Sequence, residues 1–190
     1  MLQELLKADA AMSDRRTMRS QELDGDQARQ RFIRAMRGAA TGVSVITTSG
    51  DMGRWAVTVS AVASVSADPP MVLACINRRS PVADAVRAHG IFTMNLLSSK
   101  QSHVADVFAG RSSRHKPFDF ACADWVEAGE GSLHLAGAAA SFHCVVEHVL
   151  DAGSHTVLIG KVQDAVAGSA SPLVYAGQAY ALAQALSPSM

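Results

Sequence analysis

Apolar and polar residues alternate along residues 55–60, which is the period-two pattern of a half-buried strand. One face would carry Trp55, Val57 and Val59, and the other Ala56, Thr58 and Ser60. We expect the first face to pack and the second to offer hydroxyl groups. A strand at 43–48 and a turn at 49–53 are expected before this segment, so the pattern predicts a hairpin.

A segment of small residues follows the expected strand. Ser60, Ser64 and Ser66 are interspersed with small apolar residues, which leaves backbone N–H groups accessible beside short hydroxyl side chains. Such a surface suits a phosphate or the edge of a heterocycle. Regular pairing should stop at residues 68–70, Asp-Pro-Pro, because proline lacks the N–H donor and restricts the residue before it.

A continuous apolar run at 71–76 predicts a buried strand that ends in Asn77, Arg78 and Arg79. A serine followed by a proline, Ser80-Pro81, then predicts the start of a helix that Gly90 would end. Positive charge therefore lies beside a helix N-terminus, and this combination attracts anions.

The rest of the chain predicts two further helices and several strands. Apolar residues at helical spacing, with Asp24 or Asp26 as a cap, indicate a helix that ends near residues 38–42. A strand at 91–97 precedes a helix that Ser98 or Ser99 would cap and Gly110 would close. Strand patterns at 133–150, 155–166 and 172–182 predict a β-meander, and six or more strands with few helices favour a barrel.

Length and composition indicate one domain. The chain has 190 residues, which suits a single core, and we expect residues 1–24 to form a flexible or helical arm and residues 25–185 to form the domain. The 17 basic residues balance the 17 acidic ones without a basic block, so a nucleic-acid partner is not expected. A hydrophobic content of 48% with only 18% charged residues favours a dimer that covers apolar surface.

Neither a metal site nor a nucleophilic triad can be assembled from the sequence. Cys75, Cys122 and Cys144 are an odd number at no metal spacing and read as buried free thiols in a reducing compartment. The seven histidines form no recognisable metal motif. No apolar stretch approaches the roughly 20 residues that cross a bilayer, and the first residues lack a secretory core. We expect a cytoplasmic protein without a membrane or metal.

Several short motifs, in order over roughly residues 28–182, together resemble the flavin reductase-like family, the small NAD(P)H:flavin oxidoreductases that partner two-component flavin-dependent monooxygenases. The matching segments are Thr58-Val59-Ser60-Ala61, Ser64-Val65-Ser66, Asp68-Pro69-Pro70, Cys75-Ile76-Asn77-Arg78-Arg79-Ser80, Phe92-Thr93-Met94-Asn95-Leu96-Leu97, Gly153-Ser154-His155 and Pro172-Leu173-Val174-Tyr175. Two positions depart from the family pattern. Ser60-Ala61 stands where many members have Asn-Ser, and Ser154 stands where many have Asp.

The resemblance implies a fold, an activity and a site. The fold would be mainly β with flanking helices, an FMN-binding split β-barrel that is usually homodimeric. The activity would be reduction of FMN or FAD by NADH or NADPH, with reduced flavin passing to a partner oxygenase. Hydride transfer asks little of side chains, because the cofactors supply the chemistry.

Site residues follow from the same resemblance. The flavin ring would lie along Thr58, Val59, Ser60 and Ala61, with its phosphate at Ser64, Ser66, Arg78 and Ser80 and with Lys100 adding charge. Val65, Asn77 and Asn95 complete the expected cofactor contacts, and His155 would lie near the nicotinamide as the catalytic residue. The basic loop 111–120 would be either an ordinary exposed connection or a lid over the flavin.

Two alternatives stay open. One is a flavin- or haem-binding split barrel without reductase activity, which Ser154 makes conceivable. The other is an oxidase with tightly bound flavin, of the pyridoxamine-phosphate-oxidase type, although its phosphate site would be expected to use more arginine and lysine. The choices between FMN and FAD and between NADH and NADPH also stay open, because the chain has no G-x-G-x-x-G fingerprint.

Overall fold

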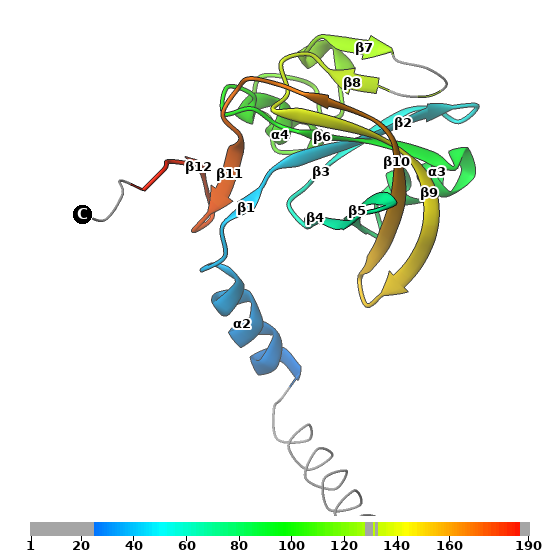
Figure 1. Cartoon of the computed structure of the whole chain (residues 1–190). Helices are drawn as coiled ribbons and strands as arrows, with labels where there is room; N and C mark the ends of the chain where they lie inside the picture. Colours follow the sequence, from blue (N-terminus) through cyan, green and yellow to red (C-terminus); the bar gives the residue numbers. More distant parts are fainter. Residues whose placement is uncertain (1–24, 128–130, 132, 187–190) are drawn as a thin grey trace, which may run out of the picture. The chain divides into compact units, whose positions relative to one another are not determined.

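The computed structural model of the chain describes residues 25–127, 131 and 133–186 (Figure 1). Contacts divide the chain into two compact units, residues 1–39 and 40–190. None of the helices in the described residues is both long and apolar enough to cross a bilayer.

The first unit contains helix α2 (Gly25–Met36). The helical spacing of apolar residues predicted this helix, and the prediction is confirmed. Asp26 lies in its first turn, where a carboxylate stabilises the helix dipole. The predicted arm at residues 1–24 lies outside the described residues, and the domain limits stay a prediction.

The second unit is built on a seven-stranded sheet in which all neighbouring strands are antiparallel, in the order β3-β2-β6-β9-β10-β5-β4. Its strands are β2 (Ser44–Gly50), β3 (Gly53–Val59), β4 (Val62–Ala67), β5 (Pro70–Asn77), β6 (Ile91–Leu96), β9 (Ala140–Ala152) and β10 (His155–Ala167). The smaller sheets contain β1 (Thr41–Gly42), β11 (Leu173–Ala176) and β12 (Ala179–Leu182), and β7 (Trp125–Glu127) with β8 (Leu133–Leu135). The helical segments of this unit are α3 (Pro81–His89), α4 (Ser102–Phe108) and the 3₁₀ turn η1 (Phe120–Cys122).

Local sequence signals account for the first half of this unit. The predicted hairpin is β2–β3, and its turn contains Gly53 at φ 86°, a value that favours glycine. Helix α3 also begins and ends as predicted. The Ser80 hydroxyl accepts the Val82 N–H, and Gly90 adopts φ 71° directly after the last helical residue.

The predicted cap of α4 is wrong. The helix begins at Ser102, and Gln101 at the cap position makes no side-chain capping bond. Ser98 and Ser99 instead pair with the segment before β11, because Ser98 forms a bridge with Pro172 and Ser99 donates its N–H to Ser171 O. Neither serine directly precedes the helix, which is the position whose side chain caps the first turn.

The predicted β-meander in the second half is also wrong. Strands β9 and β10 form a hairpin, but β9 pairs on its other side with β6 and β10 with β5. Strands β11 and β12 belong to a different sheet, with β1. Strand spacing alone did not reveal these long-range pairings.

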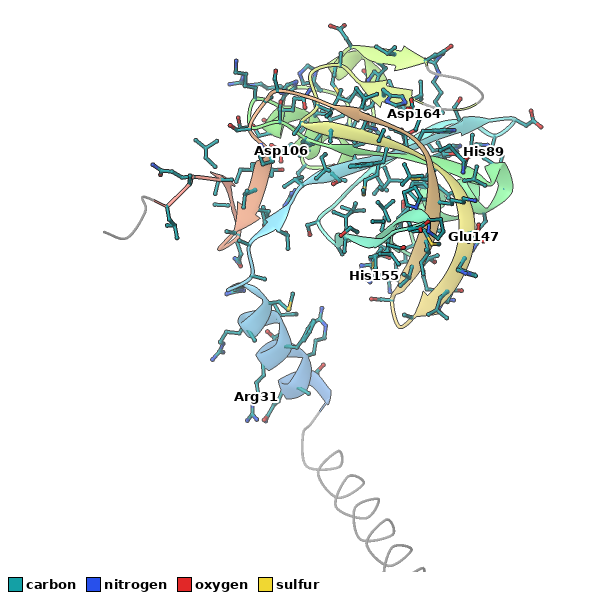
Figure 2. The ribbon with its side chains drawn as sticks, in the orientation of Figure 1. Arg31, His89, Asp106, Glu147, His155 and Asp164 are labelled. Atoms are coloured by element: carbon teal, nitrogen blue, oxygen red, sulfur yellow. The ribbon has the colours of Figure 1, made fainter. Side chains whose placement is uncertain are left out.

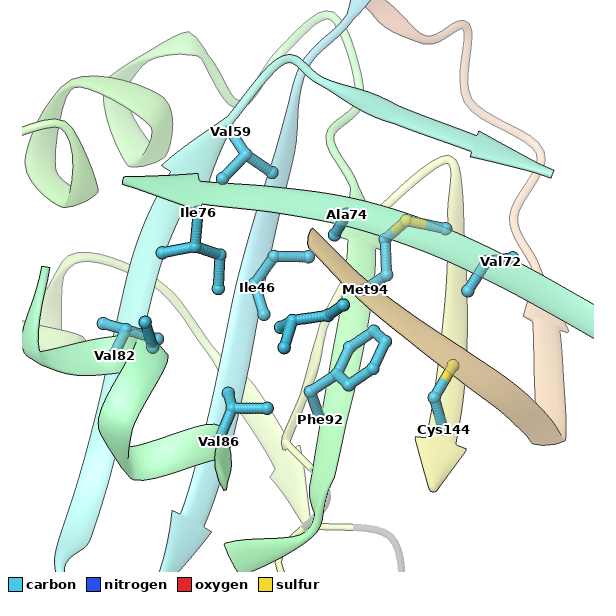
Figure 3. Close-up of a cluster of buried hydrophobic side chains, with 12 residues drawn as sticks. Ile46, Val59, Val72, Ala74, Ile76, Val82, Val86, Phe92, Met94 and Cys144 are labelled. Atoms are coloured by element: carbon cyan, nitrogen blue, oxygen red, sulfur yellow. The ribbon is translucent and has the colours of Figure 1, made fainter. Parts of the chain in front are cut away.

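One apolar core lies inside the curved sheet (Figure 3). Six of its seven strands contribute side chains, and Val82 and Val86 of α3 pack against the same cluster. Gly160 allows the close packing, since a Cβ there would lie 2.5 Å from the Phe92 ring. The sheet therefore curves around this core, as the predicted mainly-β fold with flanking helices requires.

A second core lies on the other face of β2 and β3. Helix α4, β8 and β11 pack there, together with the edge-to-face rings of Phe108, Phe120 and Trp125. Ala56 is buried in this cluster, and the Thr58 hydroxyl donates to Ala105 O at 2.7 Å. Of the three residues expected to present an open polar face, only Ser60 is exposed.

Asn95 is fully buried between β2, β8 and β9. Its Nδ2 donates to Leu133 O at 3.2 Å, and its Oδ1 accepts the Leu135 N–H at 2.9 Å and the Ser141 hydroxyl at 2.8 Å. Buried amides of this kind are costly to leave unpaired. Asn95 therefore joins β8 and β9 to the main sheet and has no exposed atom for the predicted cofactor contact.

His134 is also buried and polar, but unlike Asn95 its side chain is not hydrogen-bonded within the described part of the chain. It is only 7% exposed, and neither ring nitrogen has a hydrogen-bond partner among the described residues. Burial, together with the nearby His143, lowers the pKa of His134 below its ordinary value, although Asp164 opposes the shift. The folded protein therefore holds this imidazole neutral.

We predict that Asn95→Leu lowers the free energy of unfolding by roughly 2–4 kcal/mol, because it leaves the Leu135 N–H and the Ser141 hydroxyl buried without their acceptor. Urea unfolding measures the change. Gln163→Leu, at an exposed position on β10, is the control and should cost less than about 1 kcal/mol. Equal losses in the two variants would contradict the role given to Asn95.

We predict that His134→Val stabilises the protein, and more so at low pH. In the unfolded state, the His134 imidazole takes up a proton as the pH falls through about 6.5. In the folded state its pKa is lower, so it stays neutral over that range. The wild type therefore loses stability as the pH falls. Near pH 7.5 the gain should be about 1–3 kcal/mol, from removal of unpaired polar atoms. Unfolding curves near pH 7.5 and pH 5.5 measure it, and a difference that shrinks at the lower pH would contradict the assignment.

Candidate functional site

A cavity of about 520 Å³ opens between β3, the start of α3 and the segment after α4. Residues from three separate parts of the chain form its wall: Arg54, Trp55, Ala56, Val57, Thr58, Arg79, Ser80, Pro81, Val82, Phe108, Ala109, Phe118 and Phe120. Two predicted site residues, Thr58 and Ser80, are among them. Most of the wall is apolar, and part of its positive charge comes from Arg79.

The turn between β5 and α3 supplies that charge. Asn77 orders the turn, since its Oδ1 accepts the Arg79 N–H at 2.9 Å and its carbonyl accepts the Ser80 N–H at 2.8 Å. Arg79 lines the cavity and forms no ion pair with any described residue. Arg54 also lines the cavity, but it pairs with Glu127. A free guanidinium beside a helix N-terminus is suited to an anion such as a phosphate.

Phe118 and Phe120 bring the end of the basic loop to the cavity wall. Phe118 is 56% exposed and adopts φ 62°, a backbone conformation that non-glycine residues seldom take, while its N–H donates to Val107 O at 3.2 Å. The loop thus does more than connect two elements. A lid over a flavin remains a prediction.

A smaller cavity of about 130 Å³ adjoins the first, and Thr58 and Ala109 line both. Its wall also contains Val43, Ser60, Arg111, Tyr175 and Tyr180. The Tyr180 hydroxyl donates to Asp106 Oδ1 at 2.8 Å. Burial, reinforced by this bond to Asp106, raises the pKa of Tyr180 to about 12, so Tyr180 stays neutral. Thr58 therefore lies where the two cavities meet, and Ser60 lines the smaller one.

The predicted phosphate residues do not form one site. Ser64 pairs with Val72 near the start of β5, whereas Arg78 and Ser80 follow its far end at Asn77. At about 3.3 Å per residue, these ends are roughly 17 Å apart. Ser66 pairs with Met71, so it is about equally far from Arg78 and Ser80, and its hydroxyl accepts the Asp68 N–H. Within the single chain one phosphate cannot reach both groups, so the joint assignment stays a prediction that this geometry does not favour.

His155 lies beside the arginine pair. Antiparallel pairing of β5 with β10 sets it opposite Asn77, and the Arg78 N–H donates to Ser154 O at 3.0 Å. His155 is exposed, and its Nδ1 lies 2.9 Å from the Ser154 hydroxyl. Figure 2 shows His155 well apart from Asp106, which marks the α4 side of the unit. The structure thus brings Asn77, Arg78 and His155 together.

The remaining predicted site residues line neither cavity. Val59 is buried in the first core, and Val65 is exposed on β4. Ala61 is exposed, and its carbonyl accepts the Cys75 N–H. Lys100 is exposed in the connection before α4.

Cysteine and metal chemistry find no support among the described residues. Cys75, Cys122 and Cys144 are free, and burial raises the pKa of each thiol, that of Cys144 to about 12. Thiols with raised pKa values are poor nucleophiles near neutral pH. No group of three His, Cys, Asp or Glu side chains in the described part of the chain is placed to hold a metal ion.

Sequence reasoning missed Arg79, Phe118 and Tyr180 as members of these walls. The sequence shows the two adjacent arginines. It does not show that Arg79 lines the cavity while Arg78 lies beside the β9–β10 turn, because that turn reaches Arg78 only through the pairing of β5 with β10. Tyr180 lies directly opposite Tyr175 across the β11–β12 hairpin, and their rings pack together. The alternation of residues along the two strands could have predicted this pair from the sequence.

Comparisons with known proteins agree on one family. The family described as "Flavin reductase like domain" matches residues 36–183. The chain is 38% identical over 152 residues to the FMN reductase (NADH) RutF of Variovorax paradoxus, covering 78% of this chain and 82% of that protein. It is 36% identical to the 4-hydroxyphenylacetate 3-monooxygenase reductase component of Pseudomonas aeruginosa, covering 71% and 79%.

A solved structure gives the same result for the fold. The NADH:FAD oxidoreductase SgcE6 of Streptomyces globisporus, in complex with NAD and FAD fragments, superposes with a TM-score of 0.74 at 27% identity, covering 88% of this chain and 98% of that one. The likeness to solved flavin reductases confirms the predicted split β-barrel.

We predict that Tyr180 resists ionisation. The protein has two tyrosines, so Tyr175→Phe leaves Tyr180 as the only phenol. Its phenolate absorbance should be nearly absent at about pH 10, where an exposed tyrosine is half ionised. Adding Asp106→Asn should make ionisation easier. Half ionisation at pH 10 in the single variant would contradict the buried Tyr180–Asp106 pair.

Proposed function

The chain belongs to the flavin reductase-like family, and from this premise we propose that it is an NAD(P)H:flavin oxidoreductase. It reduces FMN or FAD by hydride transfer from NADH or NADPH and supplies the reduced flavin to a partner monooxygenase. Relatives named as FMN reductase (NADH) and as a monooxygenase reductase component support both halves of the proposal.

The observation that carries the proposal is the cavity between β3 and α3. Its aromatic and aliphatic wall suits a planar ring, and at one end Arg79 and Ser80 stand at a helix N-terminus, which suits a phosphate. The residues present therefore fit a phosphorylated flavin. Among the described residues, the cation that lines the smaller cavity is Arg111, and its guanidinium donates a hydrogen bond to the Tyr180 hydroxyl.

We assign roles to residues of this chain on that basis. Arg79, together with Ser80, holds the flavin phosphate, in place of the predicted group of four residues. The polar edge of the ring lies at Thr58, which lines both cavities, beside the exposed Ser60 hydroxyl in the smaller one. His155, opposite Asn77, lies on the nicotinamide side. The two bound nucleotides supply the hydride chemistry, and the protein binds and orients them.

A homodimer is part of the proposal. Several large apolar side chains of the β9–β10 hairpin are exposed in the single chain: Val145, Val149, Leu150 and Val166. Together with the 48% hydrophobic composition, this supports a partner subunit that covers part of the hairpin. Light scattering on the purified protein tests the dimer. Three free thiols support a reducing compartment, and we propose the cytoplasm.

We predict flavin-dependent loss of the reduced-nicotinamide absorbance when the protein is mixed with NADH or NADPH and excess FMN, FAD or riboflavin. The flavin should be released readily, because a partner oxygenase must receive it. Absence of turnover with every combination would refute the reductase and favour a binding module. Turnover only with flavin that copurifies would favour the oxidase alternative.

We predict that Arg79→Ala raises KM for FMN roughly tenfold, because it removes a charge-assisted bond to the phosphate. KM for riboflavin, which lacks the phosphate, should not change. Arg54→Ala is the matched control, since Arg54 lines the same cavity but is paired with Glu127. Equal effects on FMN and riboflavin would show that Arg79 acts on the ring or on the fold instead.

A further inference from the structure

The hairpin of β9 and β10 carries His155 at its exposed end. Residues 147–155 are all exposed. On the outer edge of β9, backbone bonds to the neighbouring segment end at Val146, whose N–H donates to Gly90 O. Beyond that residue, no described strand lies beside this edge. Within the single chain, side chains therefore hold the end of the hairpin in place on that side.

Asp151 supplies the connection. Its Oδ1 accepts Nη2 of Arg87, on α3, at 2.6 Å and the hydroxyl of Thr156 at 2.8 Å. Thr156 is fully buried and follows His155 directly in β10. The hydrogen bond from Thr156, with the charges of Arg87 and Arg78, lowers the pKa of Asp151, so the carboxylate stays ionised near neutral pH. One carboxylate thus joins α3, the end of β9 and the start of β10.

The same carboxylate also separates the two arginines. Arg78 Nε lies 3.9 Å from Asp151 Oδ2, and Arg78 Nη1 donates to Gly153 O at 3.4 Å. Arg78 is thereby drawn to the hairpin turn, whereas Arg79 lines the cavity. Asp151 consequently orders both the turn that carries His155 and the arginine beside it.

We propose, on the basis of the function proposed above, that Asp151 is a positioning residue for the nicotinamide side of the site. It holds the turn at 152–155, and with it His155, against the end of β5 without touching either nucleotide. If this connection is lost, the turn must be ordered when the reduced nicotinamide nucleotide binds. Ordering costs conformational entropy, so affinity for that nucleotide falls.

Asp151→Asn tests the proposal, and Asp84→Asn is the matched control. Asp84 also pairs with Arg87, at 3.5 Å, but it lies on α3 and touches neither strand of the hairpin. Asp151→Asn should raise KM for NADH or NADPH about fivefold, in the range of a partly exposed ion pair, while KM for the flavin stays unchanged. Asp84→Asn should change neither constant.

Amide hydrogen exchange gives a readout that does not need activity. Exchange across residues 147–156 should be faster in Asp151→Asn than in the wild type or in Asp84→Asn. If the wild type oxidises no reduced nicotinamide, the proposed function fails, and exchange alone then decides whether Asp151 orders the turn. Unchanged exchange, faster exchange with unchanged KM for the nicotinamide nucleotide, or equal effects from the two variants would each overturn the proposal.

Discussion

The antiparallel register of β5 and β10 determines where the candidate site residues lie. It sets His155 opposite Asn77 and Lys161 opposite Met71, and it joins two hairpins that are distant in sequence. A slip of one residue would reverse the faces of β10 and expose the side chains that fill the core. The arginine pair, the start of α3 and the turn with His155 meet because this register holds.

The two arginines after β5 take different roles because each has different neighbours. The Arg78 guanidinium faces the Asp151 carboxylate and the Gly153 carbonyl of the β9–β10 turn, so its charge is partly compensated. Arg79 has no carboxylate partner among the described residues and lines an otherwise apolar cavity. An uncompensated cation in such surroundings is the stronger attractor for a phosphate. The assignment of the phosphate therefore moves from Arg78 to its neighbour.

Features with short-range causes could be predicted from the sequence. Helix α3 depends on Ser80, Pro81 and Gly90, which all lie within the helix or next to it, and the β2–β3 hairpin depends on local alternation and a glycine turn. Features with long-range causes could not. Ser64 and Ser80 lie near opposite ends of β5, which are roughly 17 Å apart, and only the pairing of β4 with β5 reveals this separation. Asn95 was predicted to contact the cofactor because it belongs to a motif of the family. Its actual partners, Leu133 and Ser141, lie on strands about 40 residues away in the chain, and the sequence does not show that these strands are neighbours of Asn95.

A crystal structure of the protein with FMN would show whether the phosphate of the flavin binds at the junction of β5 and α3. We expect the phosphate within hydrogen-bonding distance of the Ser80 hydroxyl and the Arg79 guanidinium, with the ring extending toward Thr58. A phosphate beside Ser64 and Ser66, at the other end of β5, would contradict it.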